Sequence, residues 1–290
     1  MMLLNFAIFL YITTAIYCIL ALSLDFQYGQ AGLVNFGQVA FFCIGAYASA
    51  LTVLSGAPIV MGIAVAMIIT GLAGAIISFT ARNMGGTYWG IATLAIGEIV
   101  RLFVLNEDWL TGGAVGLIDI PSLPKYLFLV VVSISLIGTY LTMRFLQRTP
   151  YGRVLRIVRE DEDLSSAMGK NTFSFKMRAM AVGGTFGGLA GSLYAHYMRY
   201  IGPEAFFPIE TFIVWGMAIL GGKGNSRGII VGAIIIQFFY MGTRVIKDYL
   251  PLGAETLASL RMLIIGLLIM LIMMYRPEGL FPEKKRIYRG

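Results

Sequence analysis

Residues 26–81 read FQYGQAGLVNFGQVAFFCIGAYASALTVLSGAPIVMGIAVAMIITGLAGAIISFTA, a run of 56 residues without a single Asp, Glu, Lys or Arg. One crossing of a bilayer needs about 20 apolar residues, so this run is long enough for two. The whole chain of 290 residues follows the same trend, with 58% hydrophobic residues, 13% charged residues and a mean hydropathy of +0.80. These values exclude a soluble enzyme, a disordered chain and a nucleic-acid-binding protein, and they predict an all-α polytopic membrane protein.

Nine apolar segments follow one another, and we interpret them as membrane-spanning helices. They cover residues 3–24, 38–54, 58–80, 87–105, 125–145, 177–197, 206–221, 228–246 and 259–275. Residues 25–37 hold several amide side chains and three glycines, which makes them too polar for a lipid-facing helix and too apolar for an exposed loop. We therefore expect a re-entrant or broken segment there. The segment 206–221 is also short and could be discontinuous, so we expect about nine spans within a range of eight to ten. Residues 1–290 form a single transmembrane domain.

Lysine and arginine are distributed unevenly between the two sides of the predicted bundle. If the tail, residues 276–290, is cytoplasmic and the spans alternate, 16 of the 22 Lys and Arg residues fall on the cytoplasmic side. Cytoplasmic loops of membrane proteins carry such an excess. The hydrophilic loop 147–176 then also faces the cytoplasm, and the N-terminus lies outside with nine spans or inside with ten.

Small residues recur at helical spacing in the sixth segment. Gly183, Gly187 and Gly191 stand at every fourth position and therefore share one helix face. In lipid, such stripes let helix backbones approach closely. We expect tight helix packing along this face.

The longest hydrophilic stretch, residues 147–176, reads QRTPYGRVLRIVREDEDLSSAMGKNTFSFK. Arginines alternate with apolar residues in its first half, which predicts an amphipathic helix with one basic face. Acidic residues follow, and then a short helix that we expect to end at a glycine. The arginines alone would fit binding to anionic headgroups, but an anionic leaflet repels the acids, so a cytosolic partner protein explains the whole loop better. The residues to which we assign this role are Arg153, Arg156, Arg159, Glu160, Asp161, Glu162, Ala167 and Gly169.

The loop resembles the cytoplasmic coupling loop of ABC-importer permeases. In the branched-chain amino acid permease family (LivM-type subunits) it reads like Arg-Glu-Asn-Glu, an apolar residue and Ala-Ala-Glu-Ala-Met-Gly, where this chain has REDEDLSSAMG at residues 159–169. Further stretches resemble that family in the same order along nearly the whole chain: GLVNFGQ at 32–38, TLAIGEIVR at 93–101, LTGG at 110–113, LAGSLYA at 189–195, LGGKG at 220–224 and RPEGL at 276–280.

The resemblance implies a membrane-spanning subunit of an ATP-driven importer for leucine, isoleucine and valine, in the inner (plasma) membrane of a bacterium or archaeon. Its implied partners are two cytosolic ATP-binding subunits, a second homologous permease subunit, an extracytoplasmic solute-binding protein and membrane lipids. Some relatives are assigned to urea or short amides, so the solute stays open among these. ATP and Mg would bind to the partner chains.

No nucleotide loop or catalytic site is evident in the sequence. A P-loop requires Gly, four residues, Gly-Lys and then Ser or Thr. Around Lys223 the chain has Met217 in place of the first glycine and Gly224 in place of the hydroxyl residue. Because no metal-ligand cluster or nucleophile–base set can be assembled either, we expect a transport subunit without a cofactor or catalytic residue of its own.

Polar residues within the apolar segments are the candidates for lining the translocation path: Asn35, Gln38, Thr93, Glu98 and Arg101. An ionisable residue at membrane depth is costly, which favours a functional role. Glu98 and Arg101 stand three residues apart and could instead neutralise each other on one helix face. The two amides could equally hydrogen-bond between helices.

Four other polar residues have simpler interpretations. We expect Gln237 to hydrogen-bond between helices and His196 to lie at the membrane interface near the outer end of its helix. Glu204 and Glu210 flank an outer turn with two prolines, where we expect solvated charges.

An ion-coupled secondary transporter and a non-transporting scaffold are the alternative functions. A secondary transporter predicts intramembrane acids and two related halves. Glu98 is a single candidate acid, and no internal repeat is evident in the sequence. The polar amides and the broken segment disfavour a scaffold, because a helix bundle without a transport path does not require them.

Overall fold

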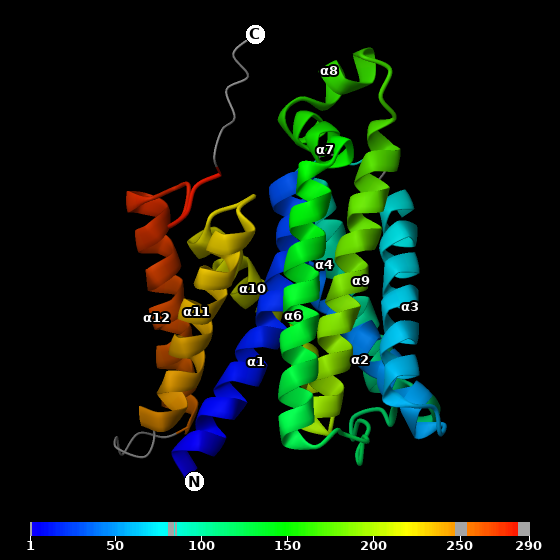
Figure 1. Cartoon of the computed structure of the whole chain (residues 1–290), viewed down its shortest axis with the longest axis vertical. Coiled ribbons are helices and arrows are strands. Elements are labelled where there is room, and N and C mark those ends of the chain that lie inside the picture. Colours follow the sequence, from blue (N-terminus) through cyan, green and yellow to red (C-terminus); the bar gives the residue numbers. More distant parts are fainter. Residues whose placement is uncertain (1, 81–83, 85, 247–253, 284–290) are drawn as a thin grey trace.

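A computed structural model describes residues 2–80, 84, 86–246 and 254–283. Within these residues, nine helices of 14 residues or more form one bundle (Figure 1): α1 (Met2–Asp25), α2 (Gln38–Leu54), α3 (Ile59–Thr80), α4 (Gly86–Asn106), α6 (Lys125–Arg148), α9 (Thr172–Met198), α10 (Pro208–Gly221), α11 (Ser226–Ile246) and α12 (Ala254–Tyr275). The shorter elements are the π-helix η1 (Phe26–Gln30), α5 (Asp108–Thr111), α7 (Pro150–Glu160), α8 (Glu162–Ala167) and the 3-10 helix η2 (Pro203–Phe206).

The predicted all-α fold is confirmed, and each predicted segment corresponds to one of the nine long helices. The largest shifts are at α9 and α12, which begin five residues earlier than their apolar segments. By length and composition, four helices in the described part of the chain can cross a membrane on their own: Leu4–Gln30, Ile59–Thr80, Gly86–Asn106 and Lys125–Arg148. The helices α2 and α10 are shorter because irregular chain precedes each of them inside the bundle.

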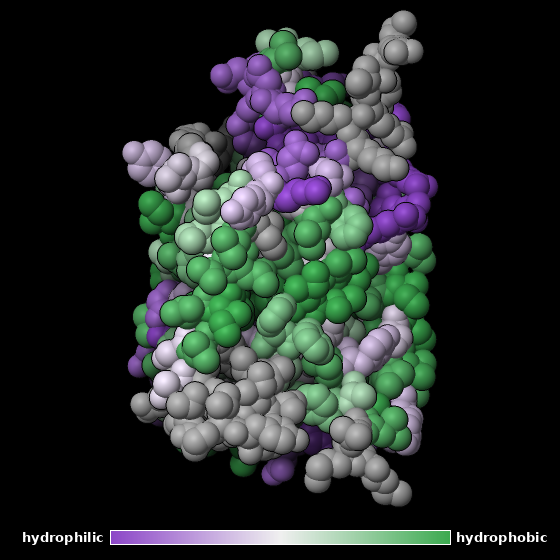
Figure 2. Space-filling model, turned by 90° about the vertical axis from the view of Figure 1, so that its left-hand side faces the viewer, coloured by the Kyte–Doolittle hydropathy of each residue, from purple (hydrophilic) through white to green (hydrophobic). Residues whose placement is uncertain are grey.

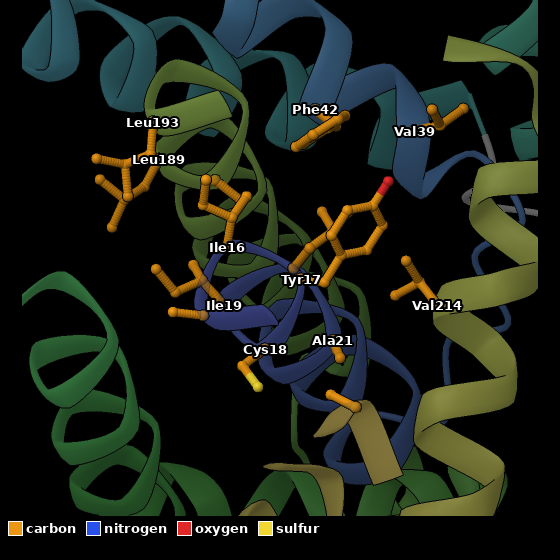
Figure 3. Close-up of a cluster of buried hydrophobic side chains, with 14 of the residues drawn as sticks. Ile16, Tyr17, Cys18, Ile19, Ala21, Val39, Phe42, Leu189, Leu193 and Val214 are labelled. Atoms are coloured by element: carbon orange, nitrogen blue, oxygen red, sulfur yellow. The ribbon is translucent and has the colours of Figure 1, made fainter. Parts of the chain in front are cut away.

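Helix α1 is the centre of the bundle. Its side chains are buried on nearly all sides from Ile12 to Leu24. Figure 3 shows Ile16 and Ile19 beside Leu189 and Leu193 of α9, while Tyr17 lies between α2 and α10. In lipid this burial stabilises the fold through van der Waals packing, since lipid tails are as apolar as the buried side chains.

Glycines of α9 lie in tight contacts with α2 and with the chain before it. A methyl group at Gly191 would collide with the carbonyl oxygen of Phe42, and one at Gly183 would collide with the amide of Gln27. At Gly187 a Cβ would lie 2.9 Å from Phe41 Cβ. The spacing of these glycines therefore lets α9 approach α2 at backbone distance.

Two groups of four helices, α1–α4 and α9–α12, repeat one pattern in opposite orientations. Their helices have 24, 17, 22 and 21 residues in the first group and 27, 14, 21 and 22 in the second. The first helix of each group packs against the second and third helices of the other, α9 on α2 and α3 and α1 on α10 and α11. Figure 1 shows α1 starting at one end of the bundle and α9 starting at the other. This internal repeat is not evident in the sequence.

The two ends of the bundle differ in character. The α7–α8 cap, residues 150–169, stands beyond the bundle at one end, where α12 also ends, whereas the N-terminus lies at the opposite end (Figure 1). Figure 2 shows the face of α11 and α12, with hydrophobic residues in a broad central band and hydrophilic residues gathered at the end that carries the cap. The loop 147–176 and the described part of the tail thus share one end of the molecule.

Candidate functional site

The chain break before α2 is held by buried amide side chains. Asn35 Nδ2 donates to Gln27 Oε1 (2.6 Å) and to Gln38 Oε1 (3.0 Å), and Gln38 Nε2 donates to Ser23 Oγ (2.6 Å). All four side chains are fully buried. The predicted break near residues 25–37 is therefore present, with η1 followed by irregular chain up to Gly37. Its amides bond to one another, which satisfies most of the polar groups that lipid could not satisfy there, although within the described residues Gln27 Nε2 has no hydrogen-bond partner.

The same break contacts the start of α10. Trp215 Nε1 donates to the carbonyl oxygen of Asn35 (2.8 Å), and Thr211 Oγ1 accepts from the backbone N–H of Val39 (3.0 Å). The Phe36 ring lies 5.1 Å from the Trp215 ring and 5.7 Å from that of Phe212. The first turns of the two short helices α2 and α10 are thereby joined.

Helix α4 contacts this first break and also a second break, the irregular chain of residues 199–207 before α10. Near its start, Thr93 Oγ1 accepts from the N–H of Phe36 (3.0 Å). Two turns later, Arg101 lies 4.7 Å above the ring of Phe207, in the break that precedes α10. Arg101 Nε also donates to Glu98 Oε2 (2.9 Å), so these two residues pair on one helix face. The Glu98 side chain is 36% exposed and that of Arg101 is 13% exposed.

The five candidate path residues thus surround the joined starts of α2 and α10. Asn35, Gln38 and Thr93 hold the first break from inside, whereas Glu98 lies on the outer face of α4. Their role in lining a path stays a prediction. The geometry shows that the amides hydrogen-bond between elements and that Glu98 and Arg101 neutralise each other.

Two residues lie in other surroundings than the sequence indicates. Glu210 is in the first turn of α10 and accepts hydrogen bonds from the hydroxyls of Tyr17 (2.7 Å) and Tyr240 (3.4 Å), so it is not a solvated loop charge. His196 lies in the last turn of α9, near the helix end as predicted, but it is fully buried in protein, with Nε2 2.9 Å from Ser49 Oγ and Nδ1 2.7 Å from the Pro121 carbonyl oxygen. Both positions depend on which helices meet, which spacing along one helix does not reveal. Glu204, by contrast, is exposed.

The sequence analysis missed Asp25 as a site residue. Its carboxylate is buried and accepts from the N–H of Gly224 (2.7 Å) in the turn between α10 and α11. A signal was present, since Asp25 is the single charged residue among the first 81. The prediction that Gln237 hydrogen-bonds between helices is wrong: its side chain is fully buried in α11, and within the described residues its amide atoms have no hydrogen-bond partner.

The α7–α8 cap is built from local signals. Pro150 occupies the first turn of α7, where its missing N–H costs nothing. Asp161 ends α7 and caps α8 by accepting from the N–H of Leu164 (2.8 Å). Gly169 ends the cap with a φ of +76°, a conformation that favours glycine. Glu160, Asp161, Glu162, Ala167 and Gly169 are all exposed.

The three arginines of the cap divide into two kinds. Arg153 is exposed. Arg156 and Arg159 are half-buried and turn toward the tail, where Glu283 Oε1 lies 3.6 Å from Arg156 and Glu283 Oε2 lies 2.9 Å from Arg159. Tyr151 anchors α7 by donating to the Phe175 carbonyl oxygen (3.1 Å), and burial raises the pKa of its phenol.

These features define a class of protein: an all-α, multi-pass membrane permease with two interrupted spans and a structured hydrophilic cap at one end. The chain matches the family model described as branched-chain amino acid transport system / permease component over residues 6–273, and it belongs to that family. The predicted family is thereby confirmed.

Individual relatives agree with this assignment. The chain is 30% identical to the high-affinity branched-chain amino acid transport system permease protein LivM of Salmonella typhimurium, over 93% of this chain and 68% of the relative. A probable LivM of Methanocaldococcus jannaschii is 29% identical over 93% and 91%. The guanosine ABC transporter permease protein NupQ of Bacillus subtilis is 28% identical over 77% and 76%. Among solved structures, PsaBC from Streptococcus pneumoniae in complex with Fab shares the fold, with a TM-score of 0.50 at 16% identity over 93% and 91%.

Proposed function

We propose that this chain is the transmembrane subunit of an ATP-driven importer whose solute is a branched-chain amino acid. The observation that carries the ATP-driven part is the exposed apolar surface of the α7–α8 cap. Ile157, Leu164 and Met168 are 46%, 53% and 65% exposed in a segment that also carries seven charged side chains. Because this segment stands beyond the bundle, we assign these apolar side chains to a contact with a partner protein rather than with lipid.

In this proposal the cap fits a cleft on a cytosolic ATP-binding subunit. Two such subunits close on ATP, displace the caps of two permease subunits and rock the spans between outward-open and inward-open states. ATP and Mg stay on the partner chains, so this chain needs no cofactor. The cap and the tail face the cytoplasm, and an extracytoplasmic protein delivers the solute at the opposite end.

We place the translocation path beside α4. A half-exposed carboxylate in a span is costly when it faces lipid, so water or a second permease subunit has to cover the face that carries Glu98. Because α4 also contacts both breaks through Thr93 and Arg101, a movement of either break reaches this face directly.

The names of the relatives support a branched-chain amino acid as the solute, and they also provide an alternative solute. Two relatives are named for branched-chain amino acid transport and one for guanosine. Urea and short amides remain further candidates from the resemblance. Solute selection by an external binding protein is compatible with the few charged groups in the spans.

An exchange of one exposed methionine tests the docking role of the cap. We expect Met168→Lys to reduce co-purification of the ATP-binding subunits and ATP-driven uptake of radiolabelled leucine by about tenfold or more, because a charge replaces an apolar contact at the interface. Met274→Lys is the matched control, since Met274 is 67% exposed at the end of α12. Unchanged association and uptake of Met168→Lys would contradict the proposal.

Uptake into vesicles that contain the purified transporter tests the proposed solute and the rival mechanism, ion-coupled secondary transport. ATP-driven uptake of guanosine or urea in place of leucine would replace the proposed solute. The inverted helix groups are also a feature of secondary transporters, so this feature does not separate the two mechanisms. Uptake by the chain alone, under an ion gradient and without ATP, would establish the secondary transporter.

A further inference from the structure

The side chain of Arg159 connects the cap to the broken segment. Arg159 stands in the last turn of α7, and its Nη1 donates to the carbonyl oxygen of Gly29 within η1. Its Nη2 pairs with Glu283 Oε2 at 2.9 Å, and Arg156 lies 3.6 Å from the other oxygen of the same carboxylate. The Arg159 side chain is 17% exposed. It therefore faces the bundle and the tail rather than a docking partner.

Gly32 makes room for this side chain. Its φ of +71° is a conformation that L side chains rarely adopt, and a Cβ there would lie 2.9 Å from Arg159 Cγ. The broken segment thus meets Arg159 at two places. The Gly29 carbonyl accepts a hydrogen bond from the guanidinium, and Gly32, which has no side chain, packs against the Arg159 stem. Because Gly29 and Gly32 flank the end of η1, Arg159 holds this end of η1 against α7.

The other side of η1 is held by the second helix group. Gly224, in the turn after α10, donates its N–H to Asp25 Oδ1 (2.7 Å) and accepts from Gln30 Nε2 (3.2 Å). Hence η1 lies between the cap and the α10–α11 turn, with one polar connection to each. Single π-helical turns are rare and are frequently found at functional sites.

We propose that Arg159 is a positioning residue that transmits displacement of the α7–α8 cap to η1, and through it to the buried amide cluster before α2. Glu283 of the tail holds the guanidinium in place for this task. The inference rests on the proposed function, because the displacement comes from ATP-binding subunits. It assigns Arg159 to force transmission and leaves docking to the exposed residues of the cap.

The chemistry requires arginine in particular. A guanidinium can donate to the Gly29 carbonyl and to the Glu283 carboxylate at once from two separate nitrogens, whereas a lysine ammonium is a single point charge on a flexible stem. Arg159→Lys therefore keeps the charge, and Arg156 keeps its own contact with Glu283. We expect the transporter to assemble normally but to transmit the movement poorly.

The test measures ATP hydrolysis and leucine uptake in the same proteoliposomes, with the complete transporter. For Arg159→Lys we expect hydrolysis within about twofold of wild type and uptake lower by about tenfold, the effect of one charge-assisted hydrogen bond. Arg148→Lys is the matched control, since Arg148 is exposed at the end of α6, outside the residues to which we assign docking, and, in the described part of the chain, makes no ion pair. An unchanged ratio of uptake to hydrolysis in Arg159→Lys would overturn the inference.

A second readout does not depend on the solute. Hydrogen exchange of the backbone amides in residues 26–37 is measured with and without ATP and vanadate. We expect a nucleotide-dependent change in wild type and in Arg148→Lys, and its loss in Arg159→Lys and Glu283→Gln. The same change in all four proteins would overturn the inference, whereas absence of ATP-binding subunits from the purified wild-type transporter would overturn the proposed function itself.

Discussion

The chain interrupts two of its spans, at residues 26–37 before α2 and at residues 199–207 before α10, and the interruptions are held differently. In the first, side-chain amides of Gln27, Asn35 and Gln38 bond to one another. In the second, the backbones of Leu117 and Ile201 exchange two hydrogen bonds (2.9 and 3.1 Å), and prolines begin both η2 and α10. Prolines lack the N–H that would otherwise be left unsatisfied, and they fix φ.

This difference in bonding indicates that the two breaks differ in how easily they can change conformation. Amide side chains can exchange hydrogen-bond partners with little backbone strain, whereas a backbone bridge together with two prolines restricts the conformation of the chain. The first break also lies at the end of the bundle that carries the cap and contacts it through Arg159. We infer that the first break moves during transport and that the second serves as a fixed support.

The largest expected effect compares one glycine in each break. A methyl group at Gly37 would collide with the backbone carbonyl of Thr93, whereas one at Gly202 meets only the flexible ends of the exposed Glu204 and Tyr200 side chains. We expect Gly37→Ala to cost about 3 kcal/mol or more and to reduce the folded yield, and Gly202→Ala to cost less than about 1 kcal/mol. Size-exclusion profiles and thermal unfolding in detergent measure both. Equal losses would mean that the two breaks are packed alike.

A smaller effect is expected from removing one amide of the first break. Asn35→Ala leaves Gln27 Oε1 and the Gly37 N–H, both buried, without the partner they have now, at a cost of about 2–3 kcal/mol. Asn106→Ala is the control, since Asn106 is exposed at the end of α4 and, among the described residues, its side chain bonds only to the Leu102 carbonyl; its cost should stay below about 0.5 kcal/mol. Thermal unfolding of the two variants side by side gives the comparison. Similar stabilities would show that the amide cluster does not hold the break.

The smallest effect concerns the prolines of the second break. Pro208 occupies the first turn of α10 in a conformation that proline favours. Pro208→Ala should destabilise the protein by about 0.5–1 kcal/mol, because the unfolded chain regains freedom while the folded contacts stay the same. Leucine uptake should remain at the wild-type level if the second break is only a support. A loss of uptake with little loss of stability would assign motion to this break instead.

The sequence was sufficient for the spans and for one of the two breaks. The charge-free run, the amides and the glycines between residues 25 and 37 conflict with both helix and loop, and this conflict predicted the first break. For the second break the sequence predicted an outer turn with two prolines and a short neighbouring span, residues 206–221, that could be discontinuous. The inverted repeat could not be predicted, because lipid demands the same apolar composition in both halves, whatever their order in space.

Contacts between distant residues explain what the site analysis missed. Arg159 and Glu283 are 124 positions apart, and Tyr17 and Glu210 are 193 apart. Their pairing follows from which helix ends meet, and helical periodicity alone does not contain that information. The cap, by contrast, depends on local residues: Pro150 begins α7, Asp161 caps the start of α8, and Gly169 ends the cap. Such signals lie within a few residues of one another and can therefore be recognised in the sequence.

The central claim is that the break before α2 moves and the break before α10 does not. Its most direct test is hydrogen exchange of the complete wild-type transporter with and without ATP and vanadate, comparing peptides that cover residues 26–37 with peptides that cover residues 199–207. We predict an ATP-dependent change in exchange in the first set and none in the second. A change confined to residues 199–207, or of equal size in both sets, would contradict this account.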